Sequence, residues 1–382
     1  MEKNKIMSEQ NSEKNSKDVR RFHMGVLGLG EGRSIMSAAL QSDDWELAQI
    51  CDLNEELCKS RCREFHFDHY TTSYEEMLKD PDVDVIAIYT PDQMHAEHIR
   101  MAMEAGKDVI CTKPLMISLH RAKELLDVQK RTGRTVFVGQ SSRYFEPARR
   151  QREDFLAGKH GELEMVQTQY ISDSRWFLAR DWSHRKGFSW MYNFMIHAVD
   201  LAAWYLPDIE KVYGCGVVSE NTKSYQIDLP DTMNFLMSDK SGRFASVTGA
   251  YAIPGFRSDV EQSISCTLRG SRGISRAGYP KLWYYTKFES EDGKAETQFH
   301  DYTDLHPYYF RFEGESHHAG EYQNYIEEYA REMRAGRTPK PDLKEGIHTL
   351  AIMEAMEESL RTGQPASVSE VLSRRGIRLE DC

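Results

Sequence analysis

Three polar residues, Asn193, His197 and Asp200, lie within a chain segment that is otherwise strongly apolar. They are spaced four and three residues apart, so a helix over residues 190–206 would place them in one polar stripe. A histidine in such a stripe can hold or relay a proton. Burial of the stripe without partners would cost about 1–3 kcal/mol for each group. We therefore expect the stripe either to face a polar site or to form a hydrogen-bonded structural pair.

A glycine-rich segment follows the first apolar stretch of the chain. Glycines at such a turn let backbone amides approach a pyrophosphate at the start of a helix. The third glycine is one position early, with Arg33 in its usual place, so an ordinary strand-to-helix turn is the alternative. Asp52 lies 22 residues after Gly30, where a carboxylate binds the adenosine ribose of a dinucleotide. The residues that we expect to bind the cofactor at this turn are Gly28, Leu29, Gly30, Glu31, Gly32 and Arg33.

Two further polar clusters each follow an apolar segment. Thr90, Pro91 and His95 follow one such segment, and Lys113 follows the next. If both segments are parallel strands, the clusters lie at the carboxyl ends, where open sheets bind ligands. A lysine buried there beside a nicotinamidium has a lowered pKa and can accept a hydroxyl proton near neutral pH. The alternative for Lys113 is a surface lysine before a turn proline.

The elements that would position these residues alternate regularly between strand and helix in the first part of the chain. Such alternation is typical of an α/β fold with a doubly wound parallel sheet and helices on both faces. Strands are predicted at 22–28, 46–51, 83–89, 108–112 and 135–139, and helices at 34–42, 55–65, 93–105 and 118–131.

After residue 143 the pattern changes to long helices and runs of alternating polarity, which predicts an α+β domain with a mostly antiparallel sheet. We expect a flexible tail at 1–21, a Rossmann dinucleotide-binding domain at 22–143 and a substrate-binding domain at 144–382, whose closing helices pack back on the first domain. The predicted helices are 147–158, 190–206, 318–335 and 344–362, and the strands 162–171, 211–219, 232–238, 243–251, 261–268 and 281–288.

Composition excludes several classes of partner. The 382 residues are 40% hydrophobic, enough for two cores. The net charge of -11 would repel nucleic acid and anionic membranes, and no stretch reaches the roughly 18 apolar residues of a membrane span. The seven cysteines are an odd number without a CxxC pair, so we expect reduced thiols, a cytoplasmic location and no metal site.

Taken in order, these motifs resemble those of the glucose-fructose oxidoreductase and inositol dehydrogenase (Gfo/Idh/MocA) family. The resemblance implies an N-terminal Rossmann domain and a C-terminal domain whose open sheet often forms an oligomer interface. It also implies oxidation of a sugar or cyclitol hydroxyl with NAD or NADP. It is carried by the glycine loop, Asp52, Thr90-Pro91 to His95, Lys113-Pro114, Arg143-Tyr144, Trp182 to Arg185, His197 with Asp200, and residues 312–368.

The resemblance also implies roles for individual residues. Lys113 matches a lysine that transfers a proton and touches both nicotinamide and substrate, and His197 matches a histidine that binds the reacting hydroxyl. This sequence departs from the family pattern at two positions, because Thr112 replaces a usual Glu and Asn193 a usual Asp. Asp200 would orient His197 or contact substrate. The expected substrate-binding residues are Arg143, Tyr144, Trp182, Arg185, Asn193 and Asp200.

Aromatic and arginine residues that precede the stripe suit a pyranose, whose ring faces are apolar and whose rim is polar; core packing is the alternative for the tryptophans. We expect NAD, rather than NADP, because Asp52 repels a 2′-phosphate, although Arg33 is a counterweight. The expected reaction is oxidation of a ring hydroxyl of a glucose-like sugar or glycoside, at C3 by analogy with relatives. A cyclitol dehydrogenase, an NAD-using glycosidase and a non-catalytic NAD-binding regulator are the alternatives. The aromatic and arginine cluster that precedes the stripe comprises Arg175, Trp176, Arg180, Trp182, Arg185, Trp190 and Tyr192, and His317 and His318 are expected as further substrate contacts.

Overall fold

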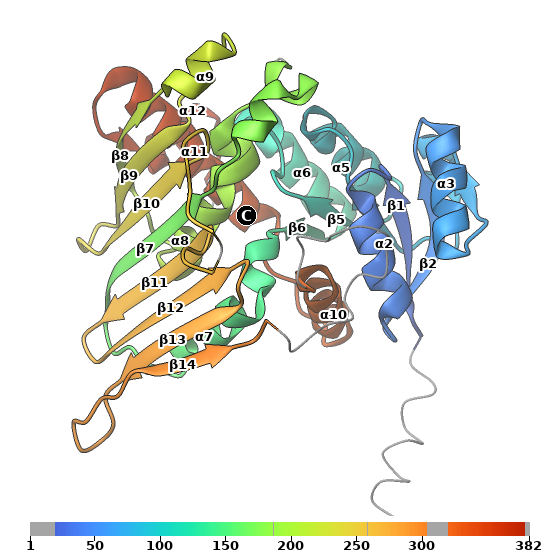
Figure 1. Cartoon of the computed structure of the whole chain (residues 1–382). Helices are drawn as coiled ribbons and strands as arrows, with labels where there is room; N and C mark the ends of the chain where they lie inside the picture. The colour runs from blue at the N-terminus through green and yellow to red at the C-terminus, as the bar shows by residue number, and fades with distance from the viewer. Residues whose placement is uncertain (1–19, 186, 258, 304–319, 379–382) are drawn as a thin grey trace, which may run out of the picture.

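A computed structural model describes residues 20–185, 187–257, 259–303 and 320–378 of the chain (Figure 1). The first part forms a six-stranded parallel sheet in the order β3-β2-β1-β4-β5-β6. This is the Rossmann order, so the doubly wound fold predicted from the alternation is confirmed. The strands are β1 (Phe22–Leu27), β2 (Trp45–Cys51), β3 (Tyr70–Thr71), β4 (Val85–Ile88), β5 (Asp108–Thr112) and β6 (Val136–Gly139).

Helices cover both faces of this sheet. Buried side chains of α5 and α6 belong to the core on one face, and those of α2 belong to the core on the other. β3 and α4 are additions to the predicted elements; both are too short for their periodicity to be recognised in the sequence. The helices are α2 (Gly32–Gln41), α3 (Glu55–Phe65), α4 (Tyr74–Lys79), α5 (His95–Glu104) and α6 (Ala122–Thr132), with short 3-10 turns η1 (Asp92–Met94), η2 (Leu119–Arg121) and η3 (Ser141–Tyr144).

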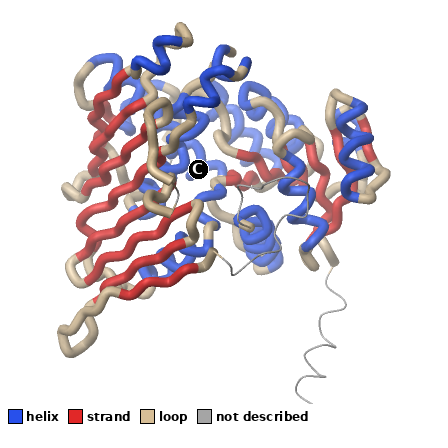
Figure 2. The backbone as a smooth tube through the Cα atoms, viewed as in Figure 1, coloured by secondary structure: helices blue, strands red, loops and turns tan. Residues whose placement is uncertain are grey.

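The second part is built on a nine-stranded sheet in the order β14-β13-β12-β11-β7-β10-β9-β8-β15 (Figure 2). β7 and β10 pair in parallel, and the other neighbouring strands pair antiparallel, as predicted. β12 was not predicted, because its two glycines weaken the strand pattern. The strands are β7 (Leu163–Ile171), β8 (Lys211–Val217), β9 (Thr232–Ser238), β10 (Phe244–Ala250), β11 (Ile264–Gly270), β12 (Gly273–Tyr279), β13 (Trp283–Phe288), β14 (Gln298–Asp301) and β15 (Ala366–Ser367).

Helices of the second part pack on the face of this sheet that is turned toward the Rossmann domain (Figure 1). The predicted helix over 190–206 begins with a π-helical turn, Met191–Met195, before α8 (Ile196–Tyr205). The predicted helix from 318 is described from residue 321 onward. The remaining elements are α7 (Glu146–Leu156), α9 (Glu220–Ser224), α10 (Glu321–Arg334), α11 (Leu343–Thr362) and α12 (Val368–Arg374), with the 3-10 turns η4 (Arg175–Ala179) and η5 (Asp181–His184).

Helix α10 returns to the Rossmann domain and packs beside α2 through aromatic side chains. The indole nitrogen of Trp45 donates to the carbonyl of Ile326 at 2.8 Å. The rings of Trp45 and Tyr329 lie 5.5 Å apart, and those of Phe137 and Tyr325 lie 5.4 Å apart. Aromatic pairs at such distances add to the stabilisation that apolar burial provides. The C-terminal part of the chain thereby completes the core on this face of the Rossmann sheet.

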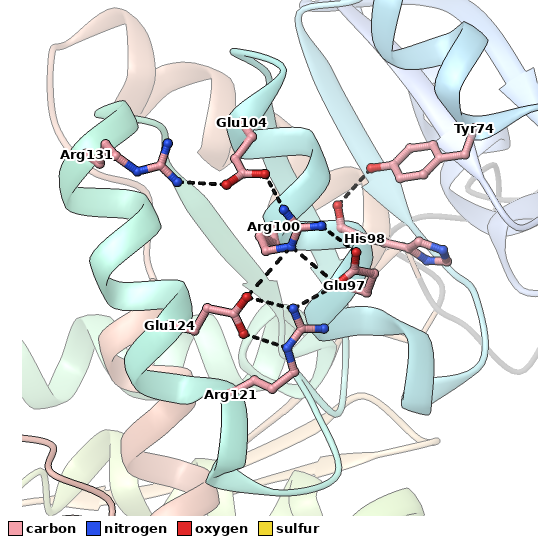
Figure 3. Close-up of polar contacts among 8 residues, drawn as sticks. All are labelled: Tyr74, Glu97, His98, Arg100, Glu104, Arg121, Glu124 and Arg131. Atoms are coloured by element: carbon pink, nitrogen blue, oxygen red, sulfur yellow. Dashed lines mark hydrogen bonds and ion pairs between the residues drawn. The ribbon is translucent and has the colours of Figure 1, made fainter.

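A network of ion pairs connects α5 with the start of α6 on the surface (Figure 3). Arg100 contacts Glu97 at 2.5 Å, and Arg121 contacts both Glu97 and Glu124 at 2.7 Å. The hydrogen bond from Arg100, helped by Arg121, lowers the pKa of Glu97 to about 2. Glu104 and Arg131 extend the network at one end.

None of the described helices combines the length and the apolar character that crossing a membrane requires.

Candidate active site

The glycine loop shows why its third glycine can stand one position early. Gly28 has a φ of +89°, and a Cβ there would lie 2.6 Å from the carbonyl oxygen of Tyr89. Helix α2 begins at Gly32, where a Cβ would lie 2.9 Å from the side chain of Val26. Gly32 therefore permits the close packing of helix on strand that the third glycine of the fingerprint provides. A Cβ at Gly30 would meet open space, so the loop leaves room for a ligand.

Asp52 lies at the end of β2 and contacts this loop directly. Its Oδ2 accepts a hydrogen bond from the Leu29 amide at 2.9 Å. The carbonyl of Leu29 accepts from Nε of Arg61 at 3.0 Å, so a carboxylate and a guanidinium flank the same residue. The loop glycines, the amino end of α2 and the Asp52 carboxylate fit the pyrophosphate and ribose of a dinucleotide.

Lys113 follows β5 and reaches across to the second domain. Its Nζ donates to the carbonyl of Asn193 at 2.7 Å. The side-chain amide of Asn193 donates to Oδ2 of Asp92 at 2.6 Å and accepts from the amide of Ser189. Asp92 follows β4, so these contacts join the carboxyl ends of two parallel strands to the π turn before α8. Asn193 occupies the position of a usual family Asp, and the structure places the Asp92 carboxylate beside it.

The surroundings of Lys113 alter the chemistry of its amine. Burial lowers the pKa of Lys113 from its ordinary 10.5, and the negative charges of Asp92 and Glu31 oppose that change. The net direction is downward, which makes the neutral amine available closer to physiological pH. An amine at this edge of the sheet can act as a general base.

His197 lies on the first turn of α8, half-buried. Its Nδ1 forms a hydrogen bond with Oγ of Ser142 at 2.7 Å, and the ring of Tyr170 stands edge-on to it at 5.8 Å. Ser142 belongs to η3, directly after β6. A bond from Nδ1 to a hydroxyl sets the orientation of an imidazole, since the ring can no longer rotate without losing it.

Arg143 and Asp200, both predicted to bind substrate, are joined to each other inside the protein. Nε and Nη2 of Arg143 bond the two carboxylate oxygens of Asp200 at 2.7 and 2.8 Å. Nη1 of Arg143 bonds Glu345 at 2.7 Å, and the hydroxyl of Thr349 contacts Asp200 at 3.4 Å. Burial alone would lower the pKa of Arg143, but the charges of Asp200 and Glu345 raise it above its ordinary value. We therefore propose a structural role for this ion pair.

Two other predicted residues also make their contacts within the protein. The His95 ring is fully buried, and its nitrogens lie 2.8 Å from the carbonyl oxygens of Pro114 and Thr90. It connects the loops after β4 and β5, so we propose that His95 supports the cofactor site through Thr90 and Pro91. The hydroxyl of Tyr144 donates to the carbonyl of Lys340 at 2.6 Å, among the aromatic rings of α10.

The structure divides the predicted aromatic and arginine cluster. Trp190 is fully buried and stacks on Tyr251, and Tyr192 is buried with its hydroxyl on Glu357, so both belong to the interior. Trp182 and Arg185 are exposed on and beside η5, so their side chains face solvent. His317 and His318 lie outside the described residues, as do residues 1–19 of the expected tail.

Sequence reasoning did not single out three residues of the site. Asp92 directly follows Thr90-Pro91 at a strand end, so its place in the sequence was a usable signal. Ser142 gives no such signal, because its contact with His197 joins distant parts of the chain. Glu64, which pairs with Arg61 at 2.8 Å and with Arg33 at 2.5 Å, lies three positions after Arg61 on α3, but its contact with Arg33 requires the tertiary structure.

A Rossmann sheet with a glycine loop that fits a dinucleotide, and a second domain that bonds the Lys113 amine through the Asn193 carbonyl and carries His197 four residues further on, define a nucleotide-dependent oxidoreductase. The chain belongs to the Gfo/Idh/MocA family. Residues 22–140 match the family's NAD-binding Rossmann domain, and residues 153–368 match its C-terminal alpha/beta domain.

Individual relatives support this membership. D-xylose 1-dehydrogenase (NADP(+)) 2 of Haloferax volcanii is 24% identical over 345 residues, which are 89% of this chain and 97% of that protein. An oxidoreductase of Agrobacterium radiobacter, solved with NAD+, L-tartaric acid and magnesium, has a TM-score of 0.80 at 19% identity, covering 92% of this chain and all of that one. A levoglucosan dehydrogenase solved with NADH and levoglucosan has a TM-score of 0.77 at 19% identity, covering 91% of this chain and 100% of that one.

Proposed function

We propose that this protein oxidises a secondary ring hydroxyl, at C3, of a glucose-like sugar or its glycoside to a keto-sugar, with NAD as the preferred cofactor. The observation that carries the proposal is the contact of Lys113 with Asn193 and, through it, with Asp92 at the carboxyl edge of the Rossmann sheet. When bound, NAD supplies the acceptor for the hydride. The protein's own residues must bind the sugar, orient it and remove the hydroxyl proton.

In this proposal Lys113 is the general base. Its lowered pKa favours the neutral amine, which accepts the hydroxyl proton at Nζ. Asp92 is a positioning residue, because its carboxylate accepts from the side-chain amide of Asn193, and the backbone carbonyl of the same residue accepts from Nζ of Lys113. The charge that the family usually places at position 193 would then be provided by Asp92 on the other domain.

His197 is the second catalytic residue of the proposal. Ser142 bonds Nδ1 and so orients the ring, and in this proposal Nε2 bonds the reacting hydroxyl. Lysine and histidine together would hold the hydroxyl oxygen in one orientation, which is the main requirement for transfer of hydride from the adjacent carbon.

The substrate class rests on two exposed side chains of the segment that precedes the π turn and on the relatives. Trp182 and Arg185 offer an apolar ring and hydrogen-bond donors, which suit a pyranose. Relatives named as dehydrogenases of D-xylose and levoglucosan support a sugar in general. The C3 position rests on analogy with sugar-oxidising relatives.

NAD is preferred over NADP in this proposal because the Asp52 carboxylate, at the end of β2, would repel a 2′-phosphate. The relative from Haloferax volcanii is named as an NADP(+) enzyme, so both cofactors should be compared directly. A kcat/KM that favours NADP would contradict this part of the proposal.

We also propose that the chain forms a homo-oligomer through the nine-stranded sheet. The face opposite the helices carries Tyr213, Leu236 and Phe299, each about half exposed. These residues lie on one row of the sheet, connected by paired residues from β8 to β14. The middle of this row is polar, with Ser246, Gln167, Thr267 and Arg276. Exposed apolar side chains at both ends of an open sheet face favour a protein–protein interface.

A panel of sugars, glycosides, deoxy sugars and inositols tests the function. We expect NADH formation with a glucose-like pyranose and a ketone located at C3 by NMR. A deoxy analogue should lose up to about 10⁴-fold in kcat/KM, because buried polar groups are left unpaired. Turnover confined to inositols would favour a cyclitol dehydrogenase, and aglycone release without net NADH would favour a glycosidase. NAD binding without any turnover would favour a regulator.

A further inference from the structure

Two arginines stand beside the dinucleotide loop, and one carboxylate holds both. Oε1 of Glu64 pairs with Nη2 of Arg33 at 2.5 Å, and Oε2 pairs with Nη1 of Arg61 at 2.8 Å. Arg33 lies on the first turn of α2, and Glu64 and Arg61 lie on one turn of α3. All three side chains are between 17% and 24% exposed, so the cluster borders solvent.

The cluster of Arg33, Arg61 and Glu64 lies next to Asp52, the residue that we expect to bind the adenosine ribose. Nε of Arg61 donates to the Leu29 carbonyl, and Asp52 accepts from the Leu29 amide. A ribose held by Asp52 would therefore have its 2′ position within the neighbourhood of Arg61. The positive charges of Arg33 and Arg61 are balanced by the negative charges of Glu64 and Asp52. This corner of the site therefore has no net charge. A guanidinium whose donors are already used by a carboxylate is a poor partner for phosphate.

We propose that Glu64 sets the cofactor preference by holding Arg33 and Arg61 in ion pairs that keep them from a 2′-phosphate. This inference rests on the proposed dinucleotide site and on the proposed preference for NAD. Without the Glu64 charge, the two guanidinium groups could bond a phosphate at the ribose 2′ position, and the corner would carry one net positive charge. Arginine pairs with phosphate readily and in two-point contacts.

The test compares AMP with adenosine 2′,5′-bisphosphate by calorimetry on the full chain, since these ligands differ only in the 2′-phosphate. In Glu64→Gln the affinity for the bisphosphate should rise by about tenfold, the size of one charge-assisted hydrogen bond, while AMP affinity stays unchanged. Glu56→Gln is the matched control, because it removes the same charge from an exposed position on the same helix. The control should change neither affinity. Adding Arg33→Gln to Glu64→Gln should remove the gain.

The affinities for whole cofactors and a second Glu64 variant provide two further tests of the role of Glu64. The ratio of NADPH to NADH affinity, measured by cofactor fluorescence, should rise in parallel in Glu64→Gln and in a second variant, Glu64→Ala. If the wild-type chain binds AMP but neither Glu64 variant gains bisphosphate affinity, the role of Glu64 is wrong while the dinucleotide site stands. An equal gain in Glu56→Gln would also overturn it, since overall charge would then be the cause. If the wild-type chain binds neither AMP nor NADH, the dinucleotide site itself is wrong.

Discussion

At the scale of single residues, the proposed chemistry depends on a lysine that two protein groups influence in different ways. The Asn193 carbonyl bonds the Lys113 amine, whereas the Asp92 carboxylate acts on its charge. Asp92 thus acts on the pKa of Lys113 through its charge and on the position of the amine through Asn193. Substitutions can therefore separate loss of the base from a change in its proton affinity.

Lys113→Ala should lower kcat by roughly 10²- to 10⁴-fold, the usual contribution of a general base. NADH affinity should change little, because the loop, α2 and Asp52 remain. Steady-state rates on the sugar found in the panel and fluorescence titration with NADH provide the two measurements. Lys123→Ala, at an exposed position of α6, is the control. Turnover near the wild-type rate would show that the base has been assigned wrongly.

Asp92→Asn should move the acid limb of the kcat/KM profile for hydroxyl oxidation to lower pH. The negative charge of Asp92 raises the pKa of Lys113, so its removal lowers that pKa further and the neutral amine persists to lower pH. The amide still offers an oxygen to Asn193. Asp82→Asn, at the other end of β4, should leave the profile in place. A limb that stays fixed or moves to higher pH would exclude Asp92 as the group that acts on Lys113.

At the scale of elements, the ion pair of Arg143 and Asp200 connects three separate segments. Arg143 belongs to η3 after β6, Asp200 to α8, and Glu345 to α11. Ser142 and His197 lie on the same two segments as the buried pair, η3 and α8. The pair therefore fixes the position of the helix that carries the proposed catalytic histidine.

Asp200→Ala should lower the free energy of unfolding by about 3–5 kcal/mol, because it leaves a guanidinium buried without its main partner. Urea unfolding followed by circular dichroism measures this loss. Asp208→Ala, just beyond the end of α8 and exposed, should have a much smaller effect. A small loss of stability together with a large rise in substrate KM would instead support the substrate contact that the sequence suggested for Asp200.

At the scale of the whole molecule, the two sheets have different surroundings. Helices cover both faces of the Rossmann sheet, whereas helices cover one face of the nine-stranded sheet (Figure 1). The open face carries the exposed apolar side chains of Tyr213, Leu236 and Phe299, and their burial between two chains would contribute roughly 25 cal/mol for each Å² of apolar surface removed from water.

Leu236→Arg should shift the oligomer toward monomers, because it places a charge among the exposed apolar side chains of the proposed interface. Sedimentation velocity over a range of concentrations measures the change. Leu156→Arg alters a leucine that is 70% exposed on α7, away from that face, and should leave the assembly intact. A wild-type chain that sediments as a monomer at all concentrations would contradict the interface.

Much of the fold could be predicted because its pattern is local. Alternating strands and helices gave the doubly wound sheet, and alternating polarity gave the antiparallel one. The exceptions were short or glycine-rich elements such as β3 and β12, whose formation depends on neighbouring strands. Trp190 shows the corresponding limit for the site, since its residue type suited both a sugar and a core, and burial placed it in the core.

The sequence by itself determined the family, the dinucleotide loop and the positions of Lys113 and His197 at strand and helix ends, because these depend on residue type and spacing along one segment. Only the tertiary structure decided which charged and polar groups are paired. Arg143 bonds Asp200, Glu64 holds Arg33, and Asp92 meets Asn193. The partners in each pair lie between 31 and 101 positions apart. Their contacts arise from the packing of separate elements, which no local pattern records.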